Sequence, residues 1–308
     1  MNRYVIGVDV GGTNIKLGIV HPLGHVIARS SFATKPFASS KLKLIGALAL
    51  EIDKLLKHEG LNHKKVAGIG IGLPGLVDVK TGVVRFLPNI PGWRNVPLKK
   101  ILQDKLKLPV FIDNDVKLIT LAEWKFGAGR GVANMVCLTL GTGVGSGLIL
   151  DNKLYRGAAN AAGELGHVPL NEDGPKCNCG GFGCFETYIG NSRLVMRANA
   201  IMKRRDMTLE EMYQLAKKGN KKALLFWQKT AEHLGNGLVG VVNLLNPQLI
   251  VIGGGVSNNH QFLFKTAQLT IARRAMSTQA SAVKIVRAAL GNDAGIIGAQ
   301  VLVKDAQS

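Results

Sequence analysis

The chain has 308 residues, 46% of them hydrophobic, which is enough for two globular domains with their own cores. Its 39 lysines and arginines outnumber 20 acidic residues and give a net charge of +19. The positive charge is scattered over amphipathic segments without interleaved aromatic residues. The composition therefore argues against a specific nucleic-acid partner and favours a basic surface that attracts small anions.

Two apolar segments resemble targeting or membrane sequences at first sight. The N-terminal run RYVIGVDV reaches Asp9 too early for a signal peptide and predicts a buried strand. The uncharged residues 235–259 contain Asn246 and Pro247, which divide them into a buried helix and the strand LIVIGG. We therefore expect no membrane span and, because the cysteines make no tidy disulfide framework, a cytoplasmic location.

The order of the apolar segments predicts an α/β protein. The first half begins with strand, glycine turn and strand in YVIGVDVGGTNIKLGIV. A helix over residues 42–58, a buried strand near 66–71 and a strand-to-helix junction in PVFIDNDVKLITLAEW follow. The strand, turn and strand return in MVCLTLGTGVGSGLIL. This repetition predicts two related domains that face each other across a cleft: residues 1–115, completed by a C-terminal helix at 294–308, and residues 116–293.

The first glycine turn, in DVGGTNIK, has the features of a phosphate-binding loop. Glycines let backbone N–H groups approach a polyphosphate, and Asp9 at the end of a strand is placed to hold Mg²⁺ through water. The alternative is an ordinary hairpin turn beside a solvated aspartate. The candidate nucleotide-binding residues here are Asp9, Gly11, Gly12, Thr13, Asn14 and Lys16.

Two further glycine-rich turns strengthen this interpretation. LGTGVGSG contributes Gly141, Thr142 and Gly143, and NPQLIVIGGGVS contributes Gly254 and Gly255. Neither a Walker lysine loop nor a dinucleotide fingerprint fits, because the glycines of the first two turns lie between strands instead of opening a helix. Two opposed phosphate hairpins predict a bound nucleotide.

One histidine and three cysteines fall within eighteen residues, in HVPLNEDGPKCNCGGFGC. His167, Cys177, Cys179 and Cys184 can form a tetrahedron around Zn²⁺ without an open position for water, which predicts a structural zinc site. Disulfides are the alternative. However, these three cysteines and a fourth, Cys137, in an apolar strand do not make a tidy framework.

Transfer of a phosphoryl group to an alcohol needs a carboxylate that accepts the hydroxyl proton. Asp115, at the predicted strand-to-helix junction, is our candidate base. The alternative for Asp115 is a helix N-cap, a structural role that suits the neighbouring Asp113 better. A polyhydroxylated substrate needs several convergent polar groups. The candidate sugar ligands are Asn114, Asp115, Glu164, His167 and Glu186, with Asn89 as a weaker one.

In their order along the chain, DVGGTNIK, GLPGLVD, FIDNDV, LGTGVGSG, GELGHV with CNCGGFGCFE, and NPQLIVIGGG resemble the ROK family (repressors, open reading frames, kinases). The resemblance spans nearly the whole chain. It implies an actin-like, ribonuclease H-like two-domain sugar kinase fold that uses ATP, Mg²⁺ and a structural zinc. It also implies a homodimer or a dimer of dimers. By position, it implies the same base, sugar ligands, zinc ligands and phosphate loops that the residues suggest.

The implied activity is that of an ATP-dependent hexose kinase of glucokinase type, acting on the 6-hydroxyl of glucose. Other family members phosphorylate mannose, fructose, allose, N-acetylglucosamine or N-acetylmannosamine, and some are sugar-sensing repressors. A repressor needs a winged helix ahead of the first phosphate loop, and only eight residues precede Asp9. A non-catalytic sugar-binding protein is the third alternative.

The chain departs from the family pattern directly behind the candidate base. Where many members read NDxNAAALGE, this chain reads NDVKLITLAE. Lys117, Leu118 and Ile119 therefore replace an asparagine and small residues. The change leaves Asp115 in place, but it alters the helix behind the base and weakens any inference about which hexose is used.

Overall fold

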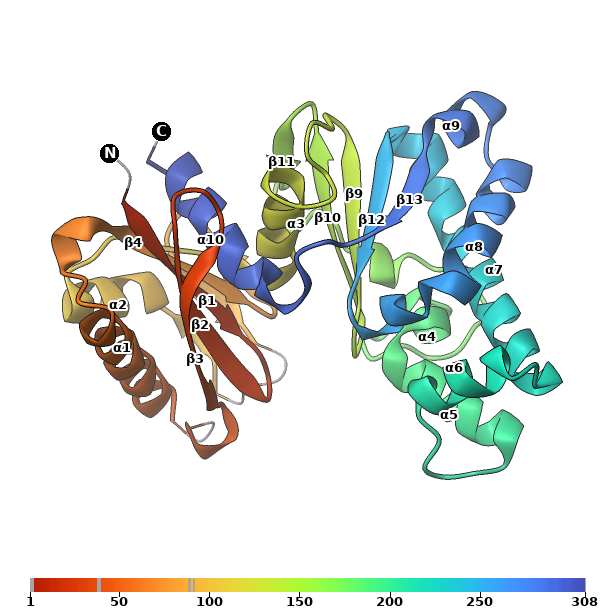
Figure 1. Ribbon diagram of the computed structural model, residues 1–308, viewed down its shortest axis with the longest axis horizontal. Helices are drawn as coiled ribbons and strands as arrows, with labels where there is room; N and C mark the ends of the chain where they lie inside the picture. The colour runs from red at the N-terminus through yellow and green to blue at the C-terminus, as the bar shows by residue number, and fades with distance from the viewer. Residues whose placement is uncertain (1–2, 38–39, 88–89, 91, 308) are drawn as a thin grey trace. The chain divides into compact units, whose positions relative to one another are not determined.

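The computed structural model describes residues 3–37, 40–87, 90 and 92–307, and the chain divides into two compact units (Figure 1). Unit 1 comprises residues 1–130, 156–162 and 290–308, and unit 2 comprises residues 131–155 and 163–289. The C-terminal helix thus belongs to unit 1, with the N-terminal part of the chain. Unit 1, however, continues beyond the predicted boundary at residue 115 to residue 130, so that the helix beginning at Asp115 lies within it.

Unit 1 is built on a five-stranded sheet in the order β3-β2-β1-β4-β8. Strands β3, β2 and β1 are antiparallel neighbours, whereas β4 and β8 run parallel to β1. A three-stranded sheet in the order β5-β6-β7 accompanies it. The strands are β1 (Tyr4–Val10), β2 (Asn14–Val20), β3 (Val26–Ala33), β4 (Val66–Leu73), β5 (Leu76–Asp78), β6 (Val83–Phe86), β7 (Arg94–Val96) and β8 (Val110–Asn114).

Two pairs of helices cover the two faces of this sheet, with α1 and α2 on one face and α3 and α10 on the other (Figure 1). Glycines let α10 approach closely, because a Cβ on Gly7 would lie only 2.2 Å from the carbonyl oxygen of Ile296. The helices are α1 (Lys41–His58), α2 (Leu98–Leu106), α3 (Asp115–Lys125) and α10 (Ala294–Asp305), with short 3-10 turns η1 (Lys35–Phe37), η2 (His63–Lys65) and η5 (Gly291–Asp293).

The helix predicted over residues 42–58 is α1, and its sequence explains its position. Leu44, Leu48, Ile52 and Leu55 recur every three or four residues and are all buried in the unit 1 core. The side chain of Ser40 caps the helix by accepting a hydrogen bond from the N–H of residue 43 (3.4 Å).

Unit 2 repeats the same sheet plan in the order β11-β10-β9-β12-β13. Strands β11, β10 and β9 are antiparallel neighbours, and β12 and β13 run parallel to β9. The repeated strand-turn-strand pattern of the sequence therefore forms an antiparallel hairpin at the equivalent place in each sheet. The strands are β9 (Met135–Leu140), β10 (Val144–Leu150), β11 (Lys153–Tyr155), β12 (Leu249–Gly253) and β13 (Lys284–Arg287).

One long helix, α7, contributes Phe226, Trp227 and Leu234 to the core of unit 2. It ends where predicted, before Asn246, which adopts a left-handed φ of +44° ahead of Pro247. The helices are η3 (Leu165–His167), α4 (Glu186–Ile189), α5 (Asn191–Met202), α6 (Leu209–Lys217), α7 (Lys221–Leu245), η4 (Gly255–Asn259), α8 (His260–Arg274) and α9 (Ser277–Ala282). Within the described residues, we find no helix both long and apolar enough to cross a membrane.

Candidate functional site

The first predicted phosphate loop is the turn between β1 and β2. The N–H of Gly11 donates to the carbonyl of Asn14 (2.9 Å), and a Cβ on Gly11 would lie 2.7 Å from that oxygen. The buried Thr34 donates its hydroxyl to the carbonyl of Gly11 and its N–H to the carbonyl of Thr13, both at 2.8 Å. The Gly11 amide is thus used inside the turn, while Gly12, Thr13 and Asn14 form its exposed surface.

Asp9 lies next to this turn, half-buried, and pairs in register with Lys16 of β2. Its withdrawal from water raises the pKa of the Asp9 carboxyl, and the positive charge of Lys16 opposes that shift. Gly295 of α10 approaches so closely that a Cβ there would lie 3.0 Å from Cγ of Asp9. A desolvated carboxylate beside a phosphate loop fits hydrated Mg²⁺, whose charge would offset the desolvation. The contact with Gly295 had no signal in the sequence.

The second predicted phosphate loop, between β9 and β10, is held by a carboxylate. Oε2 of Glu186, the first residue of α4, accepts a hydrogen bond from the N–H of Val144 (2.8 Å). A Cβ on Gly143 would lie 2.3 Å from the same oxygen, so only glycine fits beside it. The N–H of Asn191 donates to the carbonyl of Gly141 (2.9 Å). Glu186, a predicted sugar ligand, thus has one oxygen bonded to the backbone beside the second predicted phosphate turn.

The third glycine segment follows β12 and reaches the same edge of the unit 2 sheet, because β12 is the parallel neighbour of β9. Gly254 has a φ of +85°, and a Cβ there would lie 2.4 Å from the carbonyl oxygen of Leu140. Gly255 begins η4 directly afterwards. Unit 2 therefore brings the second and third glycine segments together.

The candidate base lies at the junction of β8 and α3. Asn114 is the N-cap of α3, and its side-chain oxygen accepts hydrogen bonds from the N–H groups of Val116 (3.0 Å) and Lys117 (3.3 Å). Its side-chain amide also approaches the carbonyl of Gly75 (3.4 Å). Asp115 is the first residue of the helix, half-buried, and its Oδ1 accepts from the Val116 N–H (2.9 Å). The capping role that was the alternative for Asp115 is thus filled by Asn114.

Asp113, next to these residues, has the surroundings of a structural carboxylate. It is 1% exposed. Its Oδ1 accepts a hydrogen bond from the N–H of Asn114 (2.8 Å), and its Oδ2 pairs with the guanidinium of Arg156. A buried carboxylate with both oxygens engaged is a poor candidate for the base.

Two predicted sugar ligands lie at the short turn η3, and both are exposed: Glu164 directly precedes it and His167 is its last residue. The turn is fastened to β10 by Ser146, whose hydroxyl donates to the carbonyl of Gly163 and accepts from the N–H of Leu165 (3.2 Å). These two ligands and Glu186 belong to unit 2.

The remaining predicted sugar ligands belong elsewhere. Asn114 and Asp115 are part of unit 1. Asn89, the weaker candidate, lies outside the residues that the structure describes.

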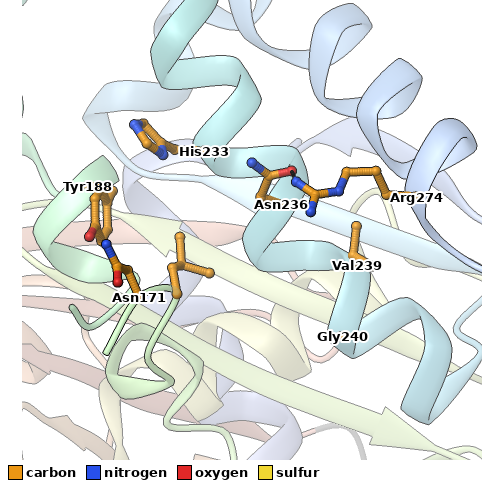
Figure 2. Close-up of a pocket in the computed structure, with 8 residues that line it drawn as sticks. Asn171, Tyr188, His233, Asn236, Val239, Gly240 and Arg274 are labelled. Carbon is orange, nitrogen blue, oxygen red and sulfur yellow. Dashed lines mark hydrogen bonds between the residues drawn. The ribbon is translucent and has the colours of Figure 1, made fainter. Parts of the chain in front are cut away.

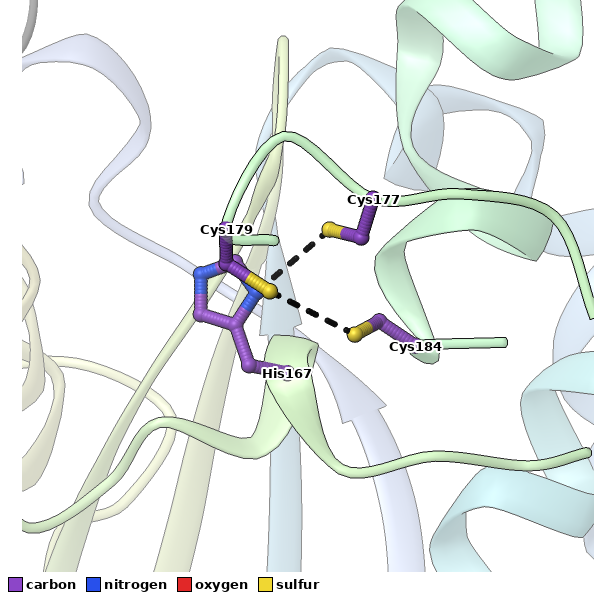
Figure 3. A group of neighbouring side chains, drawn as sticks. All are labelled: His167, Cys177, Cys179 and Cys184. Atoms are coloured by element: carbon purple, nitrogen blue, oxygen red, sulfur yellow. Dashed lines mark hydrogen bonds between the residues drawn. The ribbon is translucent and has the colours of Figure 1, made fainter. Parts of the chain in front are cut away.

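The structure brings together the four residues that the spacing singled out for a metal (Figure 3). One ligand atom from each of His167, Cys177, Cys179 and Cys184 lies within 4.8 Å of the others. Sγ of Cys177 is 3.8 Å from Nδ1 of His167, and the sulfurs of Cys179 and Cys184 are 3.6 Å apart. Three thiols and an imidazole that converge in this way are a donor set suited to zinc.

The protonation of these thiols differs between neighbours. Burial raises the pKa of the Cys184 thiol to about 12, whereas the backbone N–H of Gly181 lowers the pKa of the Cys179 thiol. Without a cation, the cluster would therefore keep a proton on Cys184. A divalent ion would favour the thiolate form of each cysteine.

A separate hollow of about 420 Å³ lies in unit 2 beside α7 and α8 (Figure 2). Its polar lining residues are Asn171, Tyr188, His233, Asn236 and Arg274. The Arg274 guanidinium donates to Oδ1 of Asn236 (2.7 Å), and the rings of Tyr188 and His233 lie 4.8 Å apart. The hollow is lined by none of the residues predicted to bind phosphate, sugar or zinc, so it is not part of the candidate site.

Known proteins resemble the chain over its whole length. The model of the ROK family matches residues 5–306. The chain is 35% identical to a glucokinase from Halalkalibacterium halodurans, in an alignment that covers 100% of this chain and 97% of that protein. It is 32% identical to a xylose repressor from Caldicellulosiruptor bescii, with 97% of this chain and 77% of the repressor covered.

Solved structures resemble it as well. A ROK family glucokinase from Streptomyces griseus, determined in complex with glucose and AMPPNP, superposes with a TM-score of 0.81. It is 32% identical, and the match covers 98% of this chain and 99% of that one. With the sheet order repeated in the two units, this likeness confirms the expected actin-like, ribonuclease H-like fold.

Proposed function

Since the chain belongs to the ROK family and resembles its sugar kinases, we propose that it transfers the γ-phosphoryl group of ATP to the 6-hydroxyl of glucose. Two relatives support this choice of substrates: the Halalkalibacterium protein named a glucokinase, and the Streptomyces glucokinase that holds glucose and an ATP analogue. The observation that carries the proposal is Asp115. It is a half-buried carboxylate at the first position of α3, beside a capping asparagine.

In the proposed reaction, Asp115 accepts the proton of the 6-hydroxyl while the hydroxyl oxygen attacks the γ-phosphorus. The new oxygen–phosphorus bond forms as the bond to the β–γ bridging oxygen breaks, and ADP leaves. The hydrogen bond from Val116 N–H to Oδ1 fixes the orientation of the carboxylate. The helix N-terminus favours its ionised, proton-accepting form.

The glycine turns are the proposed sites for the ATP phosphates. Thr34 and Glu186 hold these turns by hydrogen bonds, and Gly12, Thr13 and Thr142 are exposed residues of the turns. Asp9 would hold Mg²⁺, which when bound neutralises charge that develops on the phosphates. Lys16, paired with Asp9 in register, adds positive charge at the same place.

Glu164, His167 and Glu186, with Asn114, are the proposed sugar ligands. His167 directs Nδ1 at the sulfur of Cys177. A zinc ion there would fix the tautomer, so that the other ring nitrogen carries a proton for a sugar hydroxyl. The zinc cluster is thus proposed to orient a sugar ligand without taking part in the phosphoryl transfer.

The first test is ADP release from Mg²⁺ and ATP with glucose, mannose, fructose, N-acetylglucosamine and N-acetylmannosamine. We expect the fastest turnover with glucose. Asp115→Ala should lower kcat by about 10³-fold, because the general base is lost, while glucose affinity measured by calorimetry stays within a few fold. Wild-type turnover in that variant would contradict the assignment of the base.

Zinc is tested by metal analysis of the purified protein and by Cys179→Ser. Loss of one ligand should release zinc and raise the KM for glucose about 10-fold, because the metal would no longer fix the orientation of the His167 ring. Buried Cys137, outside the cluster, offers the control Cys137→Ala. A zinc-free protein with normal sugar affinity in Cys179→Ser would contradict the structural-zinc proposal.

A sugar sensor is the second candidate, because the Caldicellulosiruptor relative is a xylose repressor. A sensor would bind a sugar without forming ADP, so the same sugar panel separates the two functions. The homodimer or dimer of dimers implied by the family stays a prediction, which the molar mass in solution will test.

A further inference from the structure

Between two segments of unit 2, the chain contributes one short loop to unit 1. Residues 156–162 belong to unit 1, although the residues directly before and after them belong to unit 2. The loop is compact, because the N–H of Ala162 donates to the carbonyl of Arg156 (3.0 Å). Asn160 adopts a left-handed φ of +57° within it. We call these residues the 156–162 loop.

Two cationic side chains fasten this loop to the junction of β8 and α3. The guanidinium of Arg156 pairs with the buried carboxylate of Asp113, and the ammonium of Lys117 donates to the backbone carbonyl of Asn160. Asp113 lies two residues before Asp115 and Lys117 two residues after it. The candidate base therefore stands between two points at which the loop is attached.

Burial of the Lys117 ammonium group by itself costs free energy. Its side chain is only 4% exposed, and an ammonium group loses much of its hydration when it is buried. It also lies in the first turn of α3, where the helix dipole disfavours a positive charge. A buried lysine held here against two unfavourable effects needs a compensating role.

We propose that Lys117 and Arg156 are positioning residues that hold the 156–162 loop against the β8–α3 junction and so fix the backbone of Asp115. The inference rests on the proposed role of Asp115 as the base. Proton acceptance depends on sub-ångström placement, and a displacement of about 1 Å can lower turnover about 10²-fold. Neither side chain is proposed to touch the substrate.

Attachment of the loop can be measured without any kinase assay. Trypsin cleaves after arginine, so the bond between Arg156 and Gly157 reports on the loop. Lys117→Met keeps the length of the side chain but removes the ammonium group, and we expect cleavage at this bond at least about 10-fold faster. The matched control is Lys125→Met, which removes an exposed lysine from the same helix.

The positioning role is tested by steady-state kinetics of the same variants. Lys117→Met should lower kcat about 10- to 100-fold while the KM for ATP stays within about twofold, because the phosphate turns are untouched. Asn160→Gly keeps both the left-handed backbone and the carbonyl and should behave as wild type. Asn160→Val disfavours that backbone and should reproduce the Lys117→Met effects, even if Lys117→Met fails to fold.

Equal cleavage rates in the two lysine variants, or faster cleavage with unchanged kcat, would overturn the proposal. A general loss of folding would differ, since it would accelerate cleavage throughout the chain and lower the thermal unfolding midpoint, whereas release of the loop alone accelerates cleavage at the Arg156–Gly157 bond. If wild-type protein phosphorylates no sugar, the proposed function fails. Protection of the Arg156–Gly157 bond would then still decide whether Lys117 holds the loop.

Discussion

The turn of residues 11–14 in unit 1 and the turn of residues 141–143 in unit 2 connect equivalent strands, but they differ in length. Val10 pairs with Ile15, whereas Leu140 pairs with Val144, so the first connection has one more residue. A closing hydrogen bond spans each turn, from Gly11 to residue 14 in the first and from residue 141 to residue 143 in the second. Two glycine phrases that look alike therefore give loops of different geometry.

The two turns also differ in the side chain that supports them. A neutral hydroxyl, from Thr34, holds the first, and a carboxylate, from Glu186, holds the second. Each turn thus has one carboxylate nearby, but Asp9 lies at the end of the preceding strand while Glu186 is 42 residues from its partner Val144. The two carboxylates therefore fit the two roles proposed for them: Asp9 would hold Mg²⁺ at the first turn, and Glu186 would connect the sugar to the second.

Asp9→Asn tests the metal side of this comparison and has the largest expected effect. Turnover with MgATP should fall about 10²- to 10³-fold, because the carboxylate proposed to hold Mg²⁺ is lost. The thermal unfolding midpoint measured without ligands, in contrast, should not fall in Asp9→Asn. Since burial raises the pKa of Asp9, its ionised form lowers stability at neutral pH, and Asn should be neutral or stabilising there.

The raised pKa of Asp9 also determines how the stability of the folded chain changes with pH. Lowering the pH through the pKa of Asp9 in the folded chain protonates the carboxyl and removes the unfavourable charge. The stability difference between wild type and Asp9→Asn should therefore shrink on acidification. If Asp9→Asn were less stable than wild type by the same amount at every pH, Asp9 would instead have a structural role.

Gly143→Ala tests the second turn, with Gly141→Ala as its control. A methyl group on Gly143 would collide with Oε2 of Glu186 at 2.3 Å, whereas a methyl group on Gly141 has no atom of another part of the chain within 4 Å. We expect the KM for the sugar to rise roughly 10-fold in Gly143→Ala and to stay near wild type in Gly141→Ala. Equal effects of the two substitutions would mean that Glu186 does not link the turn to the sugar.

Thr34→Val tests the support of the first turn and has the smallest expected effect. It removes the hydroxyl that donates to Gly11 while it keeps the shape of the side chain. The free energy of unfolding should fall by about 1 kcal/mol, and the KM for ATP should rise by less than about threefold. Thr34→Ser keeps the hydroxyl and serves as the control. An unchanged unfolding midpoint in Thr34→Val would show that the backbone alone holds the turn.

Local patterns predicted the secondary structure well because their causes are local. The 3.6-residue spacing of leucines produced α1, the fully apolar run produced β4, and the pair Asn246 and Pro247 ended α7. The cluster of His167, Cys177, Cys179 and Cys184 is equally local, since all four residues fall within eighteen positions and tight glycine turns bring them together.

The sequence by itself determined the family, the repeated hairpin and the set of candidate residues. Only the tertiary structure decided that Asn114 caps α3, that Glu186 supports the second turn, that Gly295 approaches Asp9 and that Lys117 holds the 156–162 loop. Except for the cap, these contacts join residues more than 40 positions apart. A linear pattern records which residues can share a helix or a strand, whereas long-range contacts depend on how those elements pack.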